Sequence, residues 1–536
     1  MLKAKFLSIF FILVLTATGL ILNFTLTDSY SYKNTATYDA RWAGGLKPLN
    51  KTRIEKAKKI FLNNCASCHG TNRTGIIGPA LLPETLSFTK LSMVEGFIKN
   101  GFKGTAMPSW KGKLSSKDIA LIARYIKTVP AGKTPVWGMK QIKSSVKTII
   151  PAMLYPDKPV YKNRLGNIFF VVEKNISKGA FIDGDNWTII KQIPIGFATH
   201  EIKYTRNGEF GYAIARNGVL DKIDMYNLKV VASTKTCLDS RGVDPTYNGR
   251  YVLTGCYLPY QAVIVSGKTL QPLKVIRTNN VIGPNGKRLS SRVAATVYSR
   301  KYGVFAIALK DAGQVWIIKT KPPFPIIAEI KGVGKILHDA YIDKTGRYLL
   351  VTGMATGTIT AIDLKTDKIA SKMFVGKGAH VGPGACWNLK SGREVCATMH
   401  IFANGMSIFE IGKPWHVLKT VKTAGPSLFE RTYPGYPYVW ADNVFAGKKH
   451  DEIYVISKKP PFKVVKILIP EKGPIALHPE FSCNGKYVMI SEWAKKGELV
   501  IYNSRTLKKV KVIKGLVTPT GQFNVGDRSF HGCSEK

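Results

Sequence analysis

Acidic side chains are scarce in this 536-residue chain, which has 34 Asp and Glu residues against 79 Lys and Arg residues and a formal net charge of +45. Such an excess can attract nucleic acid, an acidic membrane surface or acidic protein partners. The basic residues, however, are spread along the whole length and form no arm or tail. We therefore expect no nucleic-acid role, and a solvated basic surface that favours acidic partners or anionic substrates.

Cysteine is also sparse, at eight residues. Six of these are scattered without the close spacing of a metal-ligand set, which argues against a structural zinc site. They are Cys237, Cys256, Cys386, Cys396, Cys483 and Cys533. The sequence leaves any disulfide pairing among them open, and we expect most of them to be small buried residues.

Residues 1–26 have the pattern of a targeting segment. Lys3 and Lys5 precede an apolar run from Phe6 to Leu26, which is the order found in a secretory signal or an uncleaved membrane anchor. The run lacks a clean Ala-x-Ala cleavage site after it, so both alternatives stay open. Either one predicts that the body of the protein is exported to the periplasm.

The other two cysteines belong to the pentapeptide Cys65-Ala66-Ser67-Cys68-His69. C-x-x-C-H is the attachment signal for c-type haem, in which both cysteines bond the porphyrin and the histidine binds iron. The sequence therefore predicts a covalent haem c with His69 as an axial ligand. Haem c is attached outside the cytoplasmic membrane in bacteria, which agrees with the predicted export.

The region around this motif, residues 45–128, predicts an all-α cytochrome c domain. Apolar residues share one face of a helix over 53–64, and Ser115 to Asp118 can cap a second helix. Between the two lies Met107, followed by proline. Small cytochromes c place their second axial ligand at such a downstream methionine, so we expect Met107 to bind the haem c iron.

Residues 129–153 are rich in Pro, Gly and Lys and predict a linker. From 154 to 530, strand-like runs alternate with turn dipeptides that recur every 41 to 54 residues. The turns are Asn207-Gly208, Asn248-Gly249, Tyr302-Gly303, Thr345-Gly346, Ser391-Gly392, Pro434-Gly435 and Asn484-Gly485. With an opening half-repeat at 165–195, they predict a mainly β chain that ends in an eight-bladed β-propeller.

Three of the nine histidines precede or begin predicted blades. His200 comes just before a strand, His338 stands shortly before the turn at Thr345, and His380 lies in a glycine-rich loop. A single histidine in a β domain is more often a hydrogen-bonded residue than a ligand. Blade-entry loops nevertheless converge on the propeller axis, so these three side chains could meet there.

A C-x-x-C-H domain followed by an eight-repeat β region resembles the cytochrome cd1 family. The resemblance covers nearly the whole mature chain and is most specific in four stretches. They are Trp137-Gly138-Met139-Lys140, Arg292-Val293-Ala294-Ala295, Ser427-Leu428-Phe429 and Val517-Thr518-Pro519-Thr520-Gly521-Gln522-Phe523-Asn524-Val525. The family carries haem c on a helical domain and haem d1 in the propeller funnel, which the resemblance implies here.

The resemblance also implies roles for individual residues. His200 is similar to the proximal ligand of the haem d1 iron, and His338 and His380 are similar to the histidine pair on the substrate face. Four further residues match positions that line the pocket or hold the carboxylates of the macrocycle, for which the guanidinium fork is well suited. They are Arg216, Arg241, Tyr257 and Arg292.

The resemblance implies a periplasmic nitrite reductase that forms nitric oxide. Nitrite plus one electron and two protons gives nitric oxide and water. Haem c would take electrons from a small soluble cytochrome c or cupredoxin, and His338 and His380 would supply charge and protons. Members of this branch are dimers, which implies a homodimer here.

A second branch of the family, which converts dihydro-haem d1 to haem d1, also resembles this chain. Its likeness lies at Asp224 to Lys229, Ser290 to Val293, Ala308 to Asp311 and Ala476 to Phe481. That branch generally keeps one distal histidine, whereas this chain has both. A non-catalytic haem-binding or electron-carrying protein is the third alternative. The pair of proton donors favours the nitrite reductase.

Overall fold

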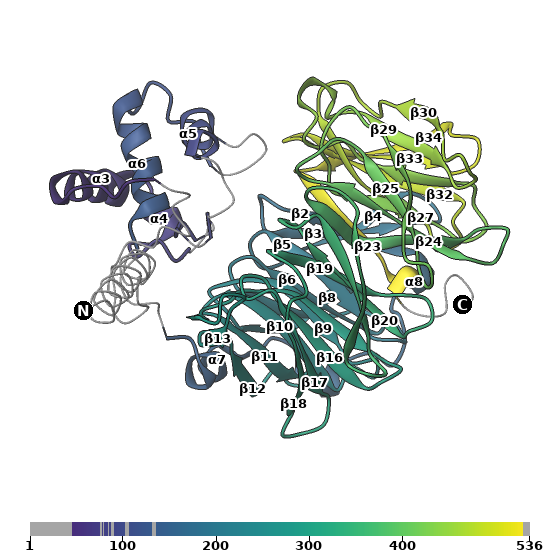
Figure 1. The fold of residues 1–536 in the computed structure, drawn as a ribbon, viewed down its shortest axis with the longest axis horizontal. Coiled ribbons are helices and arrows are strands. Elements are labelled where there is room, and N and C mark those ends of the chain that lie inside the picture. Colours follow the sequence, from purple (N-terminus) through teal and green to yellow (C-terminus); the bar gives the residue numbers. More distant parts are fainter. Residues whose placement is uncertain are drawn as a thin grey trace, which may run out of the picture. The chain divides into compact units, whose positions relative to one another are not determined.

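The computed structural model describes residues 46–528, except 76, 77, 79, 84, 87–90, 102–106 and 131–135. The chain divides into two compact units, which we describe separately. In the described part of the chain, the first contains four of the six α-helices and the second contains the sheets (Figure 1). Among the described residues, none of the helices has the length and apolar character needed to cross a membrane. The predicted signal or anchor at 1–26 lies outside the described residues.

The helical unit is built from α3 (Lys51–Asn64), α4 (Ala66–His69), α5 (Leu91–Asn100) and α6 (Ser116–Thr128). The Asn50 side chain accepts a hydrogen bond from the Arg53 amide, and Ser115 caps α6 by accepting from the Asp118 amide. The predicted helices and the predicted cap of the second one are thus confirmed.

Helices α3 and α6 pack against each other. Ala57 and Phe61 are buried on α3, and the Phe61 ring lies 6.2 Å from the Tyr125 ring of α6. Arg73, four residues beyond His69, is 2% exposed, and its Nη2 donates to the Val129 carbonyl at 2.6 Å. The haem motif is therefore anchored on both sides, by α3 before it and by Arg73 after it.

The second unit consists of eight antiparallel sheets, the blades of a β-propeller. Blade 1 is formed by β35 (Pro519–Asn524), β2 (Ile168–Glu173), β3 (Lys178–Asp183) and β4 (Thr188–Pro194). Blade 2 is formed by β5 (Thr199–Tyr204), β6 (Phe210–Ala215), β7 (Val219–Asp224) and β8 (Lys229–Lys235). Blades 3 and 4 are formed by β9 (Asp239–Pro245), β10 (Tyr251–Leu258), β11 (Gln261–Ser266) and β12 (Pro272–Arg277), and by β15 (Val293–Ser299), β16 (Val304–Leu309), β17 (Gln314–Lys319) and β18 (Ile326–Ile330).

Blade 5 is formed by β19 (Leu337–Ile342), β20 (Tyr348–Gly353), β21 (Thr358–Asp363) and β22 (Lys368–Phe374). Blade 6 is formed by β23 (Ala379–Asn388), β24 (Glu394–His400), β25 (Met406–Glu410) and β26 (Val417–Val421). Blades 7 and 8 are formed by β27 (Glu430–Thr432), β28 (Tyr438–Ala441), β29 (Ile453–Ser457) and β30 (Val464–Leu468), and by β31 (Ile475–Phe481), β32 (Tyr487–Trp493), β33 (Gly497–Asn503) and β34 (Lys509–Leu516). The prediction of an eight-bladed propeller is confirmed.

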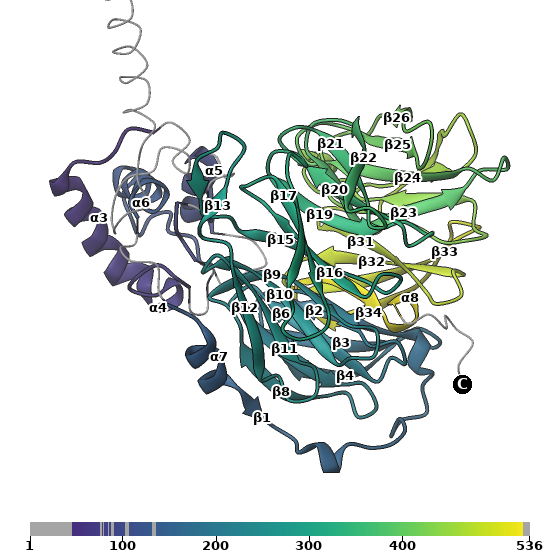
Figure 2. The same ribbon diagram turned by 60° about the horizontal axis from the view of Figure 1, so that its bottom comes forward.

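Smaller elements complete the unit. A hairpin of β13 (Val281–Ile282) and β14 (Arg288–Leu289) follows blade 3. The short helices are η1 (Ala152–Leu154), η2 (Leu165–Asn167), η3 (Gly447–Lys449) and α8 (Val525–Arg528). The predicted linker contains α7 (Met139–Ser145) and β1 (Lys147–Thr148), which run along the outer edge of blades 2 and 3 (Figure 2). There β1 pairs with β8, and Ile142 is fully buried.

The seven predicted turns join the first and second strands of blades 2 to 8. Each of their glycines has a positive φ, from +60° at Gly303 to +81° at Gly392. Glycine adopts this left-handed region without the steric cost that a Cβ imposes. The turn chemistry therefore sets the boundaries of the repeats.

The propeller closes by pairing its two ends. β35 near the C-terminus forms an antiparallel ladder with β2, in which Phe169 lies opposite Asn524 and Phe170 lies opposite Phe523. Closure removes the exposed innermost edge that either strand would otherwise present. The entry strands of all eight blades are thereby held around one axis.

Most of the scattered cysteines are disulfide-bonded, which differs from the expectation of small buried residues. Cys237 is bonded to Cys256, and Cys386 is bonded to Cys396, its direct cross-strand neighbour in blade 6. Cys483 is also disulfide-bonded, while Cys533 lies outside the described residues. The sequence conceals these pairs because their members lie 19 and 10 residues apart, on segments that only the fold brings together. Cys65 and Cys68 are free thiols, as haem attachment requires.

Candidate functional site

The three histidines singled out in the sequence come together at the start of entry strands. His200 is the second residue of β5, His338 of β19 and His380 of β23. Arg241 on β9 connects two of them, because its Nε donates to His200 Nε2 at 3.3 Å and its Nη1 lies 2.8 Å from His338 Nδ1. Arg241 thus joins His200 and His338 in one cluster, although they lie 41 and 97 residues away from it in the sequence.

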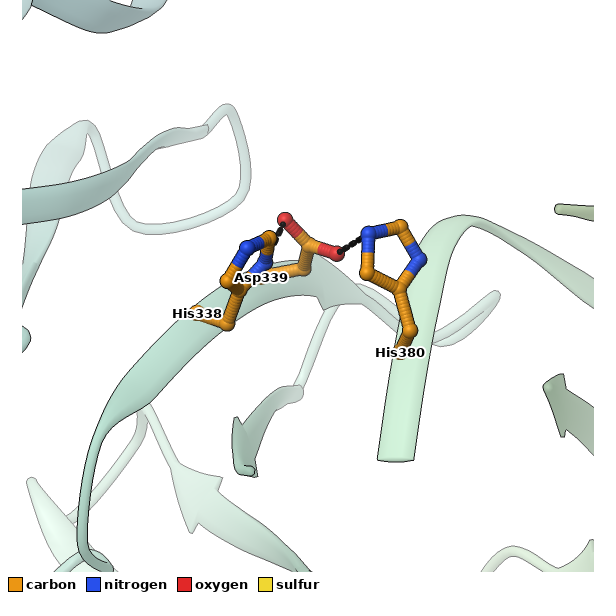
Figure 3. A group of neighbouring side chains, drawn as sticks. All are labelled: His338, Asp339 and His380. Atoms are coloured by element: carbon orange, nitrogen blue, oxygen red, sulfur yellow. Dashed lines mark hydrogen bonds and ion pairs between the residues drawn. The ribbon is translucent and has the colours of Figure 1, made fainter. Parts of the chain in front are cut away.

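Asp339 lies between His338 and His380 (Figure 3). Its Oδ1 is 2.9 Å from His338 Nδ1, and its Oδ2 is 3.0 Å from His380 Nε2. The two imidazole rings have centroids 5.0 Å apart. Arg241 Nη2 donates to Asp339 Oδ1 at 3.1 Å. Three side chains capable of handling protons therefore converge on one point, which we call the distal triad: His338, Asp339 and His380.

Burial and charge set the protonation of the distal triad. Burial, assisted by Arg241, lowers the pKa of His338 well below its usual value, and burial also lowers the pKa of His380. Burial alone would raise the pKa of Asp339, but the two histidines and Arg241 hold it well below its usual range. Near neutral pH the triad is therefore a carboxylate between two neutral imidazoles.

Tyr257 on β10 lies among several cations. Arg216 and Arg292 stand over its ring, with guanidinium carbons 5.0 and 5.4 Å from the centroid, and Lys310 Nζ is 5.9 Å away. Burial raises the pKa of Tyr257, but Lys310, Arg241, Arg292 and Arg216 together lower it to about 8. The phenol is therefore unusually acidic.

The arginines differ in how they are held. Arg292 donates three hydrogen bonds to Asp311, at 3.0 Å from Nε, 2.6 Å from Nη2 and 2.9 Å from its amide, and is 1% exposed. Its guanidinium fork is thus engaged by a carboxylate of the protein, and Arg292 contributes its positive charge near the Tyr257 ring. Arg216 Nη2 lies 2.9 Å from Asp239, and 23% of its side chain is exposed. Arg216 is the better placed of the two to meet a ligand.

Sequence reasoning missed two lysines that border the same pocket. Lys310 follows β16, and Lys174 follows β2 with its Nζ 5.9 Å from the Trp493 ring. Burial and the neighbouring arginines lower the pKa of each lysine to about 8, despite the opposing influence of Tyr257 on Lys310. Lys310 belongs to a stretch already singled out by family likeness, whereas Lys174 carries no local signal.

A fourth histidine extends the cluster. The His478 ring lies 4.5 Å from that of Phe429, which in turn lies 5.5 Å from that of His380. His478 has a φ of +55°, uncommon for a residue with a Cβ, and its amide donates to Asp442 Oδ2 at 3.1 Å. The stretch Ala476 to Phe481 pointed to this region through family likeness and left the role of His478 unassigned.

The haem motif lies in the helical unit. Cys68 and His69 belong to α4, which begins directly after Cys65, and His69 is 8% exposed. Met107 lies in the described stretch between α5 and α6, and its predicted role as the second iron ligand stays a prediction.

The residues of the propeller pocket fit a tetrapyrrole that carries carboxylates. Five basic side chains gather there against three aspartates and Glu201, and buried charge of one sign requires a partner of the other. The basic residues are Lys174, Arg216, Arg241, Arg292 and Lys310, and the aspartates are Asp239, Asp311 and Asp339. Among the described residues, His200 Nδ1 has no hydrogen-bond partner, so this imidazole is not locked by the protein on both sides.

Family models match both units of the chain. Residues 163–528 match the model described as "Cytochrome D1 heme domain", and residues 52–126 match the model described as "Cytochrome C oxidase, cbb3-type, subunit III". These ranges correspond to the propeller and to the helical unit with the C-x-x-C-H motif.

Curated relatives match over most of the chain. It is 31% identical to the dihydro-heme d1 dehydrogenase of Pseudomonas aeruginosa, over 88% of this chain and 93% of the relative. It is 30% identical to the nitrite reductase of Stutzerimonas stutzeri, over 88% and 92% respectively. A solved structure of a dihydro-heme d1 dehydrogenase is similar with a TM-score of 0.77 and 30% identity, over 88% of this chain and 99% of that one. The chain therefore belongs to the cytochrome cd1 family of oxidoreductases, with a haem c domain followed by a haem d1 propeller.

Proposed function

We propose that this protein oxidises dihydro-haem d1 to haem d1, with the electrons leaving through haem c. The observation that carries the proposal is the geometry of the distal triad, in which the Asp339 carboxylate lies 2.9 and 3.0 Å from the two imidazoles, since an imidazole can take up a proton that a neighbouring carboxylate stabilises. Removal of two hydrogen atoms from the tetrapyrrole releases two electrons and two protons. The proposal departs from the nitrite reductase that the sequence favoured.

The basic residues of the pocket support binding of this substrate. Arg216, Arg241 and Lys310 surround Tyr257 and would pair with the substrate's carboxylates through charge-assisted hydrogen bonds. His200 would hold the iron of the macrocycle, and its Nδ1 has no hydrogen-bond partner among the described residues. Asp339, with His338 and His380, would then take up the released protons and pass them on.

The helical unit would supply the electron acceptor. Cys65, Cys68 and His69 would hold haem c, with Met107 as the proposed second ligand, and the haem supplies one-electron redox chemistry. Each substrate therefore requires two electron transfers, and a small soluble electron acceptor must reoxidise the haem. Such a partner, periplasmic location and homodimer formation are parts of this proposal.

Nitrite reduction is the second candidate, and one observation favours it. The distal triad has two imidazoles with ring centroids 5.0 Å apart, and a reaction that consumes two protons suits two donors. Arg241 and Lys310 would also attract the nitrite anion. Against this candidate, Asp339 is itself an anion in the place where nitrite would bind.

One assay with two substrates separates the candidates. The full chain with haem c attached is mixed without oxygen with dihydro-haem d1 and an oxidised electron acceptor, and the visible spectrum of the tetrapyrrole is followed. In parallel, protein loaded with haem d1 receives nitrite and a reduced donor, and nitric oxide is measured with an electrode. We expect turnover of dihydro-haem d1. Nitric oxide production without oxidation of dihydro-haem d1 would instead establish the reductase, and absence of both would indicate a non-catalytic haem carrier.

A further inference from the structure

The contact between Arg241 and the distal triad has the geometry of a cation held by two acceptors. Arg241 Nη1 lies 2.8 Å from His338 Nδ1, and Nη2 donates to Asp339 Oδ1 at 3.1 Å. Guanidinium nitrogens only donate hydrogen bonds, and a carboxylate only accepts them. In the tautomer that carries its proton on Nε2, His338 Nδ1 presents its lone pair to Arg241, and it lies 2.9 Å from Asp339 Oδ1, which is another acceptor. A shared cation offsets the repulsion between these two atoms.

A third ligand atom completes this arrangement. His380 Nε2 lies 3.0 Å from Asp339 Oδ2, and the three side chains offer ligand atoms that all lie within 4.8 Å of one another. Figure 3 shows both imidazoles directed at the carboxylate between them. Ligand atoms around tetrahedral zinc, with bonds of about 2.0–2.2 Å, lie roughly 3.4 Å apart. Modest side-chain shifts would bring this set to that geometry.

We propose that the distal triad is a binding site for Zn²⁺, in which the metal takes the place of the Arg241 guanidinium. His338 Nδ1, one Asp339 oxygen and His380 Nε2 would be the protein ligands, and the fourth position would hold water. Two imidazoles with one carboxylate favour zinc over the hard cations Mg²⁺ and Ca²⁺, which prefer oxygen ligands. Bound zinc would withhold all three side chains from proton transfer, whichever of the two reactions the protein catalyses.

Zinc binding is tested on the full chain with haem c attached, by equilibrium dialysis against a zinc-buffered chelator. We expect one Zn²⁺ for each chain at this site. Asp339→Asn and His380→Ala should each weaken binding at least tenfold, because each removes a ligand. Arg241→Gln should strengthen it at least tenfold, because it removes the competing cation. His416→Ala is the control, since His416 is an exposed histidine 4.0 Å from Glu410 and should leave the triad's affinity unchanged.

Weaker binding in a variant could result from damage to the fold, whereas tighter binding could not. The expected gain in affinity in Arg241→Gln therefore separates direct metal binding from damage to the fold. X-ray absorption at the zinc edge should report two imidazole ligands for the wild type and one for His380→Ala. The proposal is overturned if Asp339→Asn binds zinc as tightly as the wild type, or if Arg241→Gln binds it less tightly. These readouts do not depend on turnover, so failure of the proposed function would leave them intact.

Discussion

At the scale of single residues, burial and neighbouring charges shift the pKa values of the distal triad and of Tyr257 away from their ordinary values. Arg241 contacts His200, His338 and Asp339 at once. The cations around Tyr257 act on one phenol that is only 7% exposed. Substitutions here should therefore change proton affinities as well as packing.

Asp339→Asn should lower turnover of the physiological substrate by about a hundredfold or more, because a neutral amide cannot stabilise the imidazolium that forms when His338 or His380 takes up a proton. Binding of the tetrapyrrole should change little, since the basic residues around Tyr257 remain. Steady-state kinetics and a spectroscopic binding titration measure the two effects separately. Asp157→Asn, at an exposed position, is the matched control. Turnover within a factor of two of wild type in Asp339→Asn would refute the proton-accepting role.

Tyr257 should titrate near pH 8 in the folded protein, and difference absorbance of wild type and Tyr257→Phe should show this phenolate. The lowered pKa means that the folded state loses this proton before the unfolded state does. The wild type should therefore gain stability relative to Tyr257→Phe as the pH rises from about 8 to 10, by about 2–3 kcal/mol at most. Chemical unfolding at both pH values measures the gain. A constant difference across this range would contradict the lowered pKa.

At the scale of elements, the blades depend on turns and cross-strand bonds that repeat along the chain. The turn glycines lie in the left-handed region, and the two disulfides with described partners connect neighbouring strands or the segments beside them. These features set the strand registers, and the registers bring His200, His338 and His380, the second residues of β5, β19 and β23, into one cluster.

Gly346→Ala should destabilise the propeller by about 1–2 kcal/mol, because φ is +69° at this position. A Cβ here would meet only the flexible side chain of Lys301, at 3.4 Å or more, so the cost comes from backbone strain. Denaturant unfolding followed by tryptophan fluorescence measures it, with the neighbouring Lys344→Ala as the control. An unchanged midpoint would show that the turn relaxes without strain.

Replacing both Cys386 and Cys396 by alanine should cost up to about 3 kcal/mol, since the bond closes a loop between cysteines 10 residues apart. The comparison is made by unfolding the oxidised wild type and the double variant under identical conditions. A variant as stable as the oxidised protein would show that the bond constrains the unfolded chain too little to matter.

At the scale of the whole molecule, the chain forms two compact units, so a change that unfolds one unit can leave the other folded. The propeller is closed by β35 and β2, whereas the haem motif lies in the helical unit. Each unit has its own core, so loss of ring closure should not abolish the haem c fold.

Deleting the chain from Val517 onward should abolish the cooperative unfolding of the propeller and its tetrapyrrole binding. The deletion exposes the edge of β2 and removes the buried side chain of Phe523. The visible spectrum of haem c should persist, which serves as the internal control. Tetrapyrrole binding at wild-type affinity would show that closure is dispensable.

Much of this architecture follows from local chemistry that sequence reasoning can read. The C-x-x-C-H motif specifies its own ligation, each turn glycine needs only its own φ, and eight repeats of strands can bury their faces only against one another. The cluster at the axis is different, because Arg241 meets His200 and His338 across 41 and 97 residues, and Lys174 joins them with no local signal at all. Those contacts exist because ring closure forces distant entry strands to share one axis, and the exact hydrogen bonds made there depend on side-chain packing that no single segment encodes.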